Sequence, residues 1–125
     1  MAIEPDEIQL AAIAGSAGGP DDGPVVMLNL NRYRDRDAYN RYGVVALRVL
    51  ERVGGRVLWD LPVTGTVIGG DDERYDDVIA VWYPSRSAFL ELAGAPEIQE
   101  ARADRSTGLE RATLICCDAA GLAES

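Results

Sequence analysis

Three polar side chains lie in predicted β-strands, at positions where they could do chemistry: Asn29, Arg56 and Asp60. The amide of Asn29 could donate a hydrogen bond to a carbonyl or enolate oxygen of a substrate. Arg56 could hold an anionic group, and Asp60 could act as a base, because burial adjusts the pKa of a carboxyl group. These are our candidate catalytic residues. The structural alternatives are a hydrogen-bonded interface amide for Asn29 and an exposed ion pair between Arg56 and Asp60.

Four further side chains are predicted to share this surface and to contact the substrate: Met27, Asn31, Leu58 and Trp82. Trp82 could stack on an aromatic ligand, or it could pack in the core of an interface. The predicted surface is mostly apolar with a few polar groups, which is the usual composition of a small-molecule pocket.

The residue types that the chain lacks exclude several kinds of catalysis. There is no histidine and no lysine, so histidine-bound zinc or haem, a Ser-His-Asp triad and a Schiff-base lysine are excluded. The two cysteines, Cys116 and Cys117, are adjacent, and neighbouring strand residues point to opposite faces. We expect them to be small apolar side chains. No cofactor and no metal is expected.

The acidic composition limits the possible partners. The 125 residues include 21 acidic and 12 basic side chains, which gives a formal net charge of -9. Such a surface repels nucleic acid and anionic membranes, and no apolar run is long enough to span a bilayer. The first residues are acidic, unlike a secretory signal. We therefore expect a cytoplasmic protein whose partner is a small organic molecule, with no nucleic acid and no membrane.

The chain divides into an arm, a domain and a tail. Residues 1–24 predict a short helix followed by a linker rich in glycine and proline. Residues 25–118 predict a single α+β domain, and residues 119–125 a tail that frays.

The first half of the domain begins with a strand at 25–32. An apolar stripe then predicts a helix that ends near Val53, with Asp35 or Asp37 as its N-cap. Gly43 inside this helix suggests close packing against a neighbour. A strand follows at 56–61, interrupted by Pro62.

The second half resumes the strand at 64–68, and a polar turn leads to a strand at 78–83. A helix at 85–94, a short turn at 96–103 and a last strand at 112–117 complete the domain. The order strand, helix, strand, strand, helix, strand is typical of a ferredoxin-like sandwich, in which both helices cover one face of an antiparallel sheet.

Alternation along the first strand assigns its two faces. We expect Val26, Leu28 and Leu30 to face the helices, and Met27 and Asn29 to lie on the uncovered face. That face would carry too much apolar surface to meet water. A homodimer that packs two sheets face to face would cover it and would enclose a barrel-like interior.

Four sequence runs carry a resemblance to a known family: GPVVMLNLNRYRD, AYNRYG, VGGRVLW and WYPSRSAFLELAGAPEIQEA. Over residues 23–117 the chain resembles the bacterial family called domain of unknown function 1330. The resemblance implies a dimeric α/β-barrel, in a superfamily shared with cofactor-free monooxygenases, muconolactone-type isomerases and some polyketide cyclases. The reaction of the family is not established, so no catalytic residue is transferred, and the histidines of several relatives are absent here.

Two functions are compatible with these observations. The first is a cofactor-independent small-molecule enzyme, of the isomerase, cyclase or oxygenase type, with its pocket on the open sheet face. The alternative is a non-catalytic dimer that binds a ligand or another protein.

Overall fold

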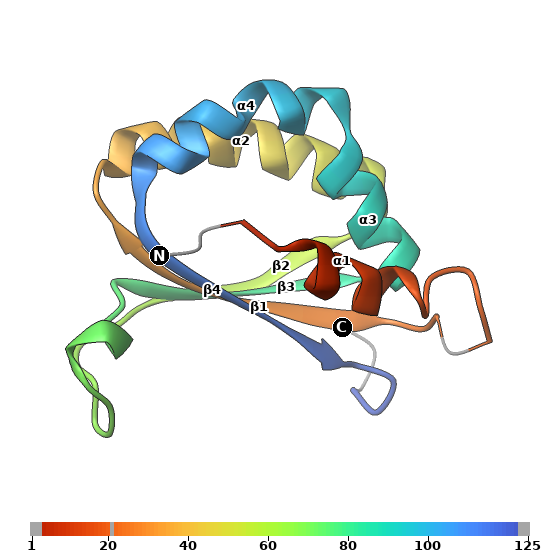
Figure 1. Cartoon of the computed structure of the whole chain (residues 1–125), viewed down its shortest axis with the longest axis horizontal. Coiled ribbons are helices and arrows are strands. Elements are labelled where there is room, and N and C mark those ends of the chain that lie inside the picture. Colours follow the sequence, from red (N-terminus) through yellow and green to blue (C-terminus); the bar gives the residue numbers. More distant parts are fainter. Residues whose placement is uncertain (1–3, 21, 123–125) are drawn as a thin grey trace.

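The computed structural model describes residues 4–20 and 22–122, and it has the predicted α+β architecture. Its four-stranded antiparallel sheet has the order β2-β3-β1-β4, which is the ferredoxin-like topology. Helices cover one face of this sheet (Figure 1). The elements are α1 (Glu7–Ala14), β1 (Val25–Tyr33), α2 (Arg36–Arg52), β2 (Arg56–Pro62), the short 3-10 helix η1 (Asp71–Glu73), β3 (Asp77–Tyr83), α3 (Arg86–Gly94), α4 (Pro96–Gly108) and β4 (Leu109–Asp118).

Helix α2 forms the main support of the covered face. The side chain of Asp35 caps its first turn by accepting a hydrogen bond from the backbone N–H of Ala38, at 3.1 Å. Its apolar side buries Val49 and Leu50 in the core. Within the described ranges, no helix is long and apolar enough to cross a membrane.

Two segments differ from their prediction. In place of a short turn at 96–103, α4 is a full helix with proline in its first turn, and it lies alongside α2 (Figure 1). It buries only Ile98, Ala101 and Gly108, so its apolar period is too weak to recognise in the sequence. The predicted strand at 64–68 is also wrong, since β2 ends at Pro62 and residues 63–70 form no strand.

The predicted faces of β1 are wrong by one residue. Val25 and Met27 are 0% and 2% exposed and pack in the core with Val49 and Leu50 of α2. Leu28 therefore faces away from the helices, together with its neighbours two residues before and after. Both faces of this strand are rich in apolar residues, so alternation alone could not decide which one the helices cover.

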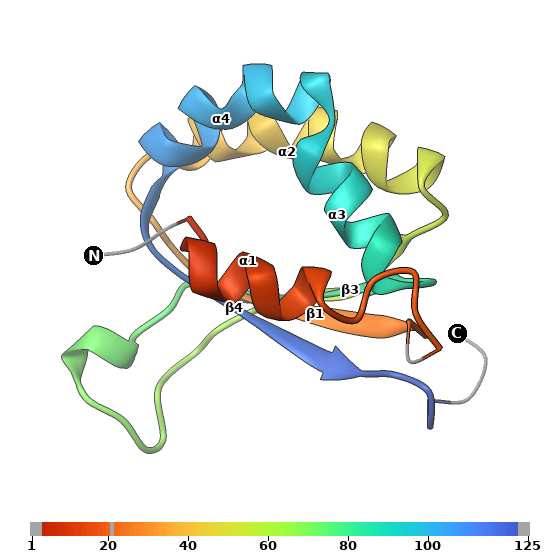
Figure 2. The ribbon, with the colours of Figure 1, turned by 45° about the vertical axis from the view of Figure 1, so that its right-hand side comes forward.

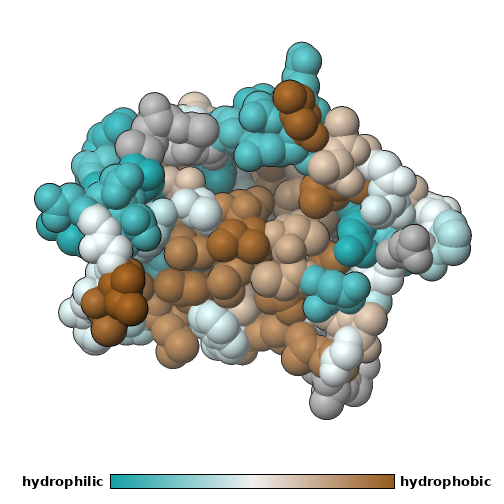
Figure 3. Space-filling view, turned by 60° about the horizontal axis from the view of Figure 1, so that its bottom comes forward, coloured by the Kyte–Doolittle hydropathy of each residue, from teal (hydrophilic) through white to brown (hydrophobic). Residues whose placement is uncertain are grey.

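The face of the sheet that the helices leave free is strongly apolar. Trp59, Leu61 and Ile115 are 41%, 54% and 44% exposed there. Figure 3 shows hydrophobic residues gathered across this side of the molecule. We call it the uncovered face; by strand register its apolar residues are Val26, Leu28, Leu30, Trp59, Leu61, Val78, Ala80, Trp82 and Ile115.

The N-terminal arm lies against the side of the domain. Helix α1 buries none of its residues, and it lies near α3 (Figure 2). Asp22 fastens the arm to the start of α3, because its carboxylate accepts hydrogen bonds from the backbone N–H groups of Arg86 and Ser87 and from the Ser87 hydroxyl. The N–H of Gly18 donates to the same carboxylate, and these bonds hold the pKa of Asp22 at about 2.

Two glycines have opposite surroundings. A Cβ on Gly108, where α4 passes into β4, would lie 2.6 Å from the backbone nitrogen of Tyr39. The Gly108 carbonyl also accepts the N–H groups of Arg34 and Asp35, at 2.8 and 3.2 Å. A Cβ on Gly43, inside α2, would have no atom within 4 Å, so close packing does not explain this glycine.

We expect Gly108→Ala to lower the free energy of unfolding by about 1–3 kcal/mol, because the added methyl group must displace the backbone at the start of α2. Gly43→Ala is the matched control and should raise it by up to about 1 kcal/mol. Urea unfolding followed by circular dichroism measures both. An unchanged midpoint for the Gly108 variant would contradict the close approach.

Candidate functional site

A cavity of about 810 Å³ lies between the sheet and the helices. It is on the covered face, so the expectation that the pocket would lie on the open sheet face is wrong. The size is ordinary for a small-molecule site. Strands β1, β2 and β3 form its floor and α2, α3 and α4 its walls, with an apolar lining that includes Met27, Leu50, Val57, Ile79, Val81 and Phe89.

Polar groups occur at one end of this cavity. The strand register places Asn29, Ile79 and Asp60 side by side across β1, β3 and β2. The Nδ2 of Asn29 donates to the backbone carbonyl oxygens of Met27 and Ile79, at 3.2 and 3.4 Å. The amide N–H groups are therefore used within the sheet, and Asn29 presents its oxygen to a ligand as an acceptor, not as the predicted donor.

The next row of the sheet contains a buried carboxyl group, Asp77, which is 2% exposed. Its Oδ2 accepts a hydrogen bond from the hydroxyl of Tyr33 at 2.7 Å and one from Arg36 at 3.4 Å. Its paired residue on β1, Asn31, is also 2% exposed and donates to the hydroxyls of Tyr33 and Tyr39, at 3.5 and 3.4 Å. The polar end of the cavity is thus supported by a second, buried layer of polar groups.

The carboxyl groups of Asp60 and Asp77 lie on the same face of the sheet. Asp60 is paired with Ile79, two residues beyond Asp77 on β3, so the two carboxyl groups are diagonal neighbours. Burial raises the pKa of Asp77; the Tyr33 hydrogen bond lowers it in part, and the nearby Asp60 raises it again. Asp77 consequently keeps its proton to a higher pH than an ordinary aspartic acid.

A row of tyrosine rings extends from this polar end along the inner side of α2. The ring centroids of Tyr33 and Tyr39 are 5.0 Å apart, and those of Tyr39 and Tyr42 are 5.6 Å apart. The guanidinium of Arg36 lies 4.3 Å from the centroid of the Tyr33 ring. Burial raises the pKa of Tyr39 to about 12. Because Tyr39 lines the cavity, its phenol is a protonated hydroxyl that can donate to a ligand.

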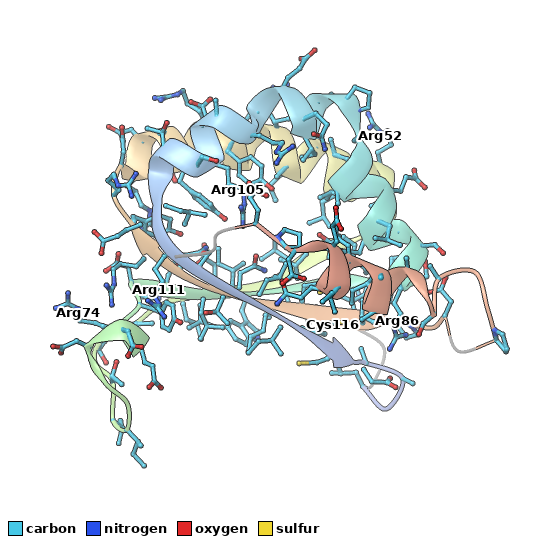
Figure 4. All side chains as sticks on the ribbon, in the orientation of Figure 1. Arg52, Arg74, Arg86, Arg105, Arg111 and Cys116 are labelled. Atoms are coloured by element: carbon cyan, nitrogen blue, oxygen red, sulfur yellow. The ribbon has the colours of Figure 1, made fainter. Side chains whose placement is uncertain are left out.

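Charged groups of the arm and of α4 also border the cavity. Arg105 points from α4 toward the N-terminal arm (Figure 4), and its Nη1 is 3.5 Å from Oε1 of Glu4. Arg102 is 4.0 Å from the same carboxylate. Glu4, Arg102 and Arg105 all belong to the cavity lining, as do Pro5 and Leu10 of the arm. The arm therefore adds both charge and apolar surface to the site.

The structure brings three of the predicted site residues together. Met27, Asn29 and Asp60 line the same cavity. Asn31 does not line it, because it is buried in the layer behind.

The other predicted site residues are elsewhere. Arg56 lies on the uncovered face, where its guanidinium is 5.1 Å from the centroid of the Trp82 ring. Leu58 stands at a register irregularity in β2 and does not line the cavity. This irregularity inserts one residue between Arg56 and Asp60, so the two side chains point to opposite faces and cannot form the predicted pair.

Sequence reasoning missed Asp77, Tyr33 and Tyr39. Asp77 ends a run of acidic turn residues, and Tyr33 precedes a charged loop, so both resemble surface positions. The available signal was the period of two along β3, which places Asp77 on the same face as Ile79. In the part of the chain that the structure describes, no three His, Cys, Asp or Glu side chains form a group that could hold a metal ion.

The fold and the site define a ferredoxin-like α+β domain with a polar-ended cavity between its sheet and its helices. The chain belongs to the family described as Domain of unknown function (DUF1330), whose model matches residues 25–118. The resemblance found in the sequence is therefore confirmed. Among curated proteins, no match to this chain is found.

Solved structures give the same family and fold. A protein of unknown function from Rhodopseudomonas palustris is 34% identical over 91% of this chain and 93% of its own, with a TM-score of 0.82. The methylated form of that protein is 32% identical over 94% of this chain and 93% of its own, with a TM-score of 0.84.

More distant structures share the fold alone. A dabb family protein with a ferredoxin-like fold from Mesorhizobium loti is 16% identical over 77% of this chain and 96% of its own, with a TM-score of 0.56. A putative antibiotic biosynthesis monooxygenase from Bacteroides thetaiotaomicron is 14% identical over 82% of this chain and 97% of its own, with a TM-score of 0.53.

We expect Tyr33→Phe to lower the free energy of unfolding by about 1–3 kcal/mol, because it removes a hydrogen bond to the buried Asp77 carboxyl group. Tyr75→Phe is the matched control. It removes the bond between the Tyr75 hydroxyl and Thr113 Oγ1, which are 2.7 Å apart, and should cost about 1 kcal/mol or less. Thermal and urea unfolding measure the two variants; equal losses would contradict a special role for Tyr33.

Proposed function

We propose that this protein binds a small, mostly apolar organic molecule in the cavity between its sheet and its helices. The carrying observation is the cavity itself, which combines an apolar lining with Asn29, Asp60 and Tyr39 at one end. An apolar body would fill the wide part of the cavity. A carbonyl or hydroxyl group would reach the polar end, where Tyr39 can donate and the oxygens of Asn29 and Asp60 can accept hydrogen bonds.

The charged border adds a second requirement for the ligand. Arg102 and Arg105 belong to the lining, and Glu4 of the arm lies against both. An acidic group on a ligand would compete with Glu4 for these cations. Entry of such a ligand would then displace the arm from this side of the cavity.

Catalysis without a cofactor is our preferred function for the site. Asp60 is a carboxylate in the cavity lining, and Tyr39 is a neutral donor in the same lining, which is a suitable pair for a base and an oxyanion-stabilising group. The description of one structural relative as a putative antibiotic biosynthesis monooxygenase associates this fold with small-molecule chemistry. A binding protein without catalysis is the second candidate, favoured by the Asn29 amide, whose N–H groups already donate to backbone carbonyls.

The uncovered face supports a homodimer. Its exposed Trp59, Leu61 and Ile115 form part of a continuous apolar surface, and a surface of this kind is stabilised when a second copy covers it. Within such a dimer, Arg56 and Trp82 would contact the interface, not the ligand. The cavity would remain a separate site inside each subunit.

We expect Gly43→Leu to weaken binding in the cavity at least about tenfold, because Gly43 lines the cavity and a side chain there enters open space. The readout is titration with the fluorescent probe anilinonaphthalene sulfonate, together with native mass spectrometry of molecules that co-purify.

Gly94→Leu is the control for this substitution, since Gly94 also has open space around it but does not line the cavity. Both variants leave the uncovered face unchanged. Equal probe binding by both would place the ligand outside the cavity and would contradict the proposal.

For the dimer, we expect the wild type to sediment as a dimer at micromolar concentration and Ile115→Arg to sediment as a monomer. A buried arginine without a partner is costly in an apolar interface. Val67→Arg, in a loop and 97% exposed, should remain dimeric. A monomeric wild type would refute the expected pairing.

A further inference from the structure

One buried oxygen atom in the polar layer has no obvious role in the fold. Within the described ranges, Oδ1 of Asp77 is buried and has no hydrogen-bond partner, although Oδ2 of the same carboxyl group has two. A buried acceptor without a partner costs about 1–3 kcal/mol. Native structures seldom retain such a group unless it serves a function or is satisfied in another protonation state.

The nearest explanation is the carboxyl group of Asp60. It lies diagonally across the sheet from Asp77, on the same face, and the charge of Asp60 contributes to the raised pKa of Asp77. Two carboxylates at this range repel each other. One proton between them turns the repulsion into a hydrogen bond and satisfies the orphan oxygen of Asp77.

We propose that Asp60 and Asp77 form a carboxylate–carboxylic acid pair that shares one proton. In this pair, Asp60 acts as the base that removes a proton from an enolisable carbonyl compound bound in the cavity and then returns it. This inference rests on the function proposed above, because it needs a ligand in that cavity. It adds the class of substrate and the type of reaction.

Position decides which member of the pair does which task. Asp60 is exposed and lines the cavity, so it is the group that touches the ligand. Asp77 is buried behind it and does not line the cavity, so it is a positioning residue that holds the proton and orients Asp60.

The groups around Asp77 favour this division. Tyr33 from β1 donates to its Oδ2, and Arg36 from α2 lies 3.4 Å from the same atom. Tyr39 from α2 and Asp60 from β2 also act on the titration of Asp77 or are affected by its charge. Burial raises the pKa of Asp77 despite its two donors, so Asp77 is the member of the pair that holds the shared proton.

The chemical step is balanced without an oxidant, a reductant or a cofactor. The Asp60 carboxylate removes a proton from the carbon beside the ligand carbonyl. The electron pair of that C–H bond forms a carbon–carbon double bond, and the carbonyl oxygen takes the negative charge. Tyr39, which lines the same cavity, can stabilise this oxyanion by a hydrogen bond. Asp60 then returns the proton to the same carbon or to a conjugated one, which restores the carbonyl group.

Titration of the two carboxyl groups tests the pair without any ligand. In the full chain labelled with carbon-13 at its aspartate carboxyl groups, we expect one carboxyl signal to titrate above the ordinary pKa of aspartic acid, which is about 4. Asp77→Asn should remove that step. Ordinary titration of both groups in the wild type would overturn the proposal.

Proton transfer is tested with β-tetralone, an apolar bicyclic ketone with exchangeable hydrogens beside its carbonyl. Proton NMR in heavy water follows the exchange of these hydrogens, and saturation transfer from the protein reports binding of the ketone independently. We expect the wild type to accelerate exchange and Asp60→Asn to reduce the acceleration by about 100-fold or more. Asp104→Asn is the matched control, because Asp104 forms an exposed ion pair with Arg41 and does not line the cavity.

The same Asp77→Asn variant tests whether Asp77 acts on catalysis through Asp60. Asp77→Asn keeps a donor beside Asp60, so we expect exchange to persist with a pH profile that shows one ionisation instead of the two macroscopic steps of a coupled pair. An unchanged profile would overturn the role of Asp77. Saturation transfer without accelerated exchange in the wild type would overturn the proton transfer and leave the binding function standing. Absence of saturation transfer would contradict both.

Discussion

The arrangement of this protein depends on a helical layer that covers one face of the sheet without filling the space beneath it. Val49 and Leu50 of α2 anchor the helices to Val25 and Met27 of β1. Nearer the start of α2, Gly43 has no side chain, and the space that a side chain would enter there is open to the cavity. The core is consequently concentrated at one part of the interface, and the rest of the space between the layers is available to a ligand.

The polarity of that space follows from strand register. Along β1, successive rows of the covered face pair Met27 with Val81, then Asn29 with Ile79, which has Asp60 on its other side, and then Asn31 with Asp77. The share of polar side chains therefore rises from one row to the next. The buried layer contacts one of the polar groups that reach the cavity, because Asn31 donates a hydrogen bond to the Tyr39 hydroxyl, whereas Asn29 is held by backbone carbonyls.

Much of the architecture could be predicted from the sequence, because local signals and the global fold agree. The Asp35 cap, the apolar stripe of α2 and the order of strands and helices all follow from local chemistry. Helix α4 could not be recognised, since it buries little and its apolar period is weak. For a strand such as β1, the period of two shows which residues share a face. It does not show which of the two faces the helices cover, and only the tertiary contacts of the fold determine that.

The site was predicted less well for related reasons. Asn29 and Asp60 were identified as residues in β-strands that could do chemistry, and they do lie on one row of the covered face, on either side of Ile79. Arg56 was grouped with Asp60 because a regular strand would place both on one face, but the irregularity at Leu58 separates them. Asp77 was missed because an acidic residue at the end of an acidic turn is normally exposed, and its burial depends on Tyr33 and Arg36, which come from distant parts of the chain.

The attachment of the N-terminal arm has a consequence for the cavity, because residues of the arm form part of the cavity lining. The carboxylate of Asp22 has a pKa of about 2, because it accepts hydrogen bonds from Gly18 within the arm and from Ser87 and Arg86 at the start of α3. Its contribution is therefore complete above the ordinary aspartate range and is lost only as the pH falls toward that value. At neutral pH the Asp22 carboxylate is ionised, so protonation does not break its bonds to α3. Glu4, Pro5 and Leu10 of the arm, which line the cavity, are thus kept beside it by a contact that does not respond to pH changes near neutrality.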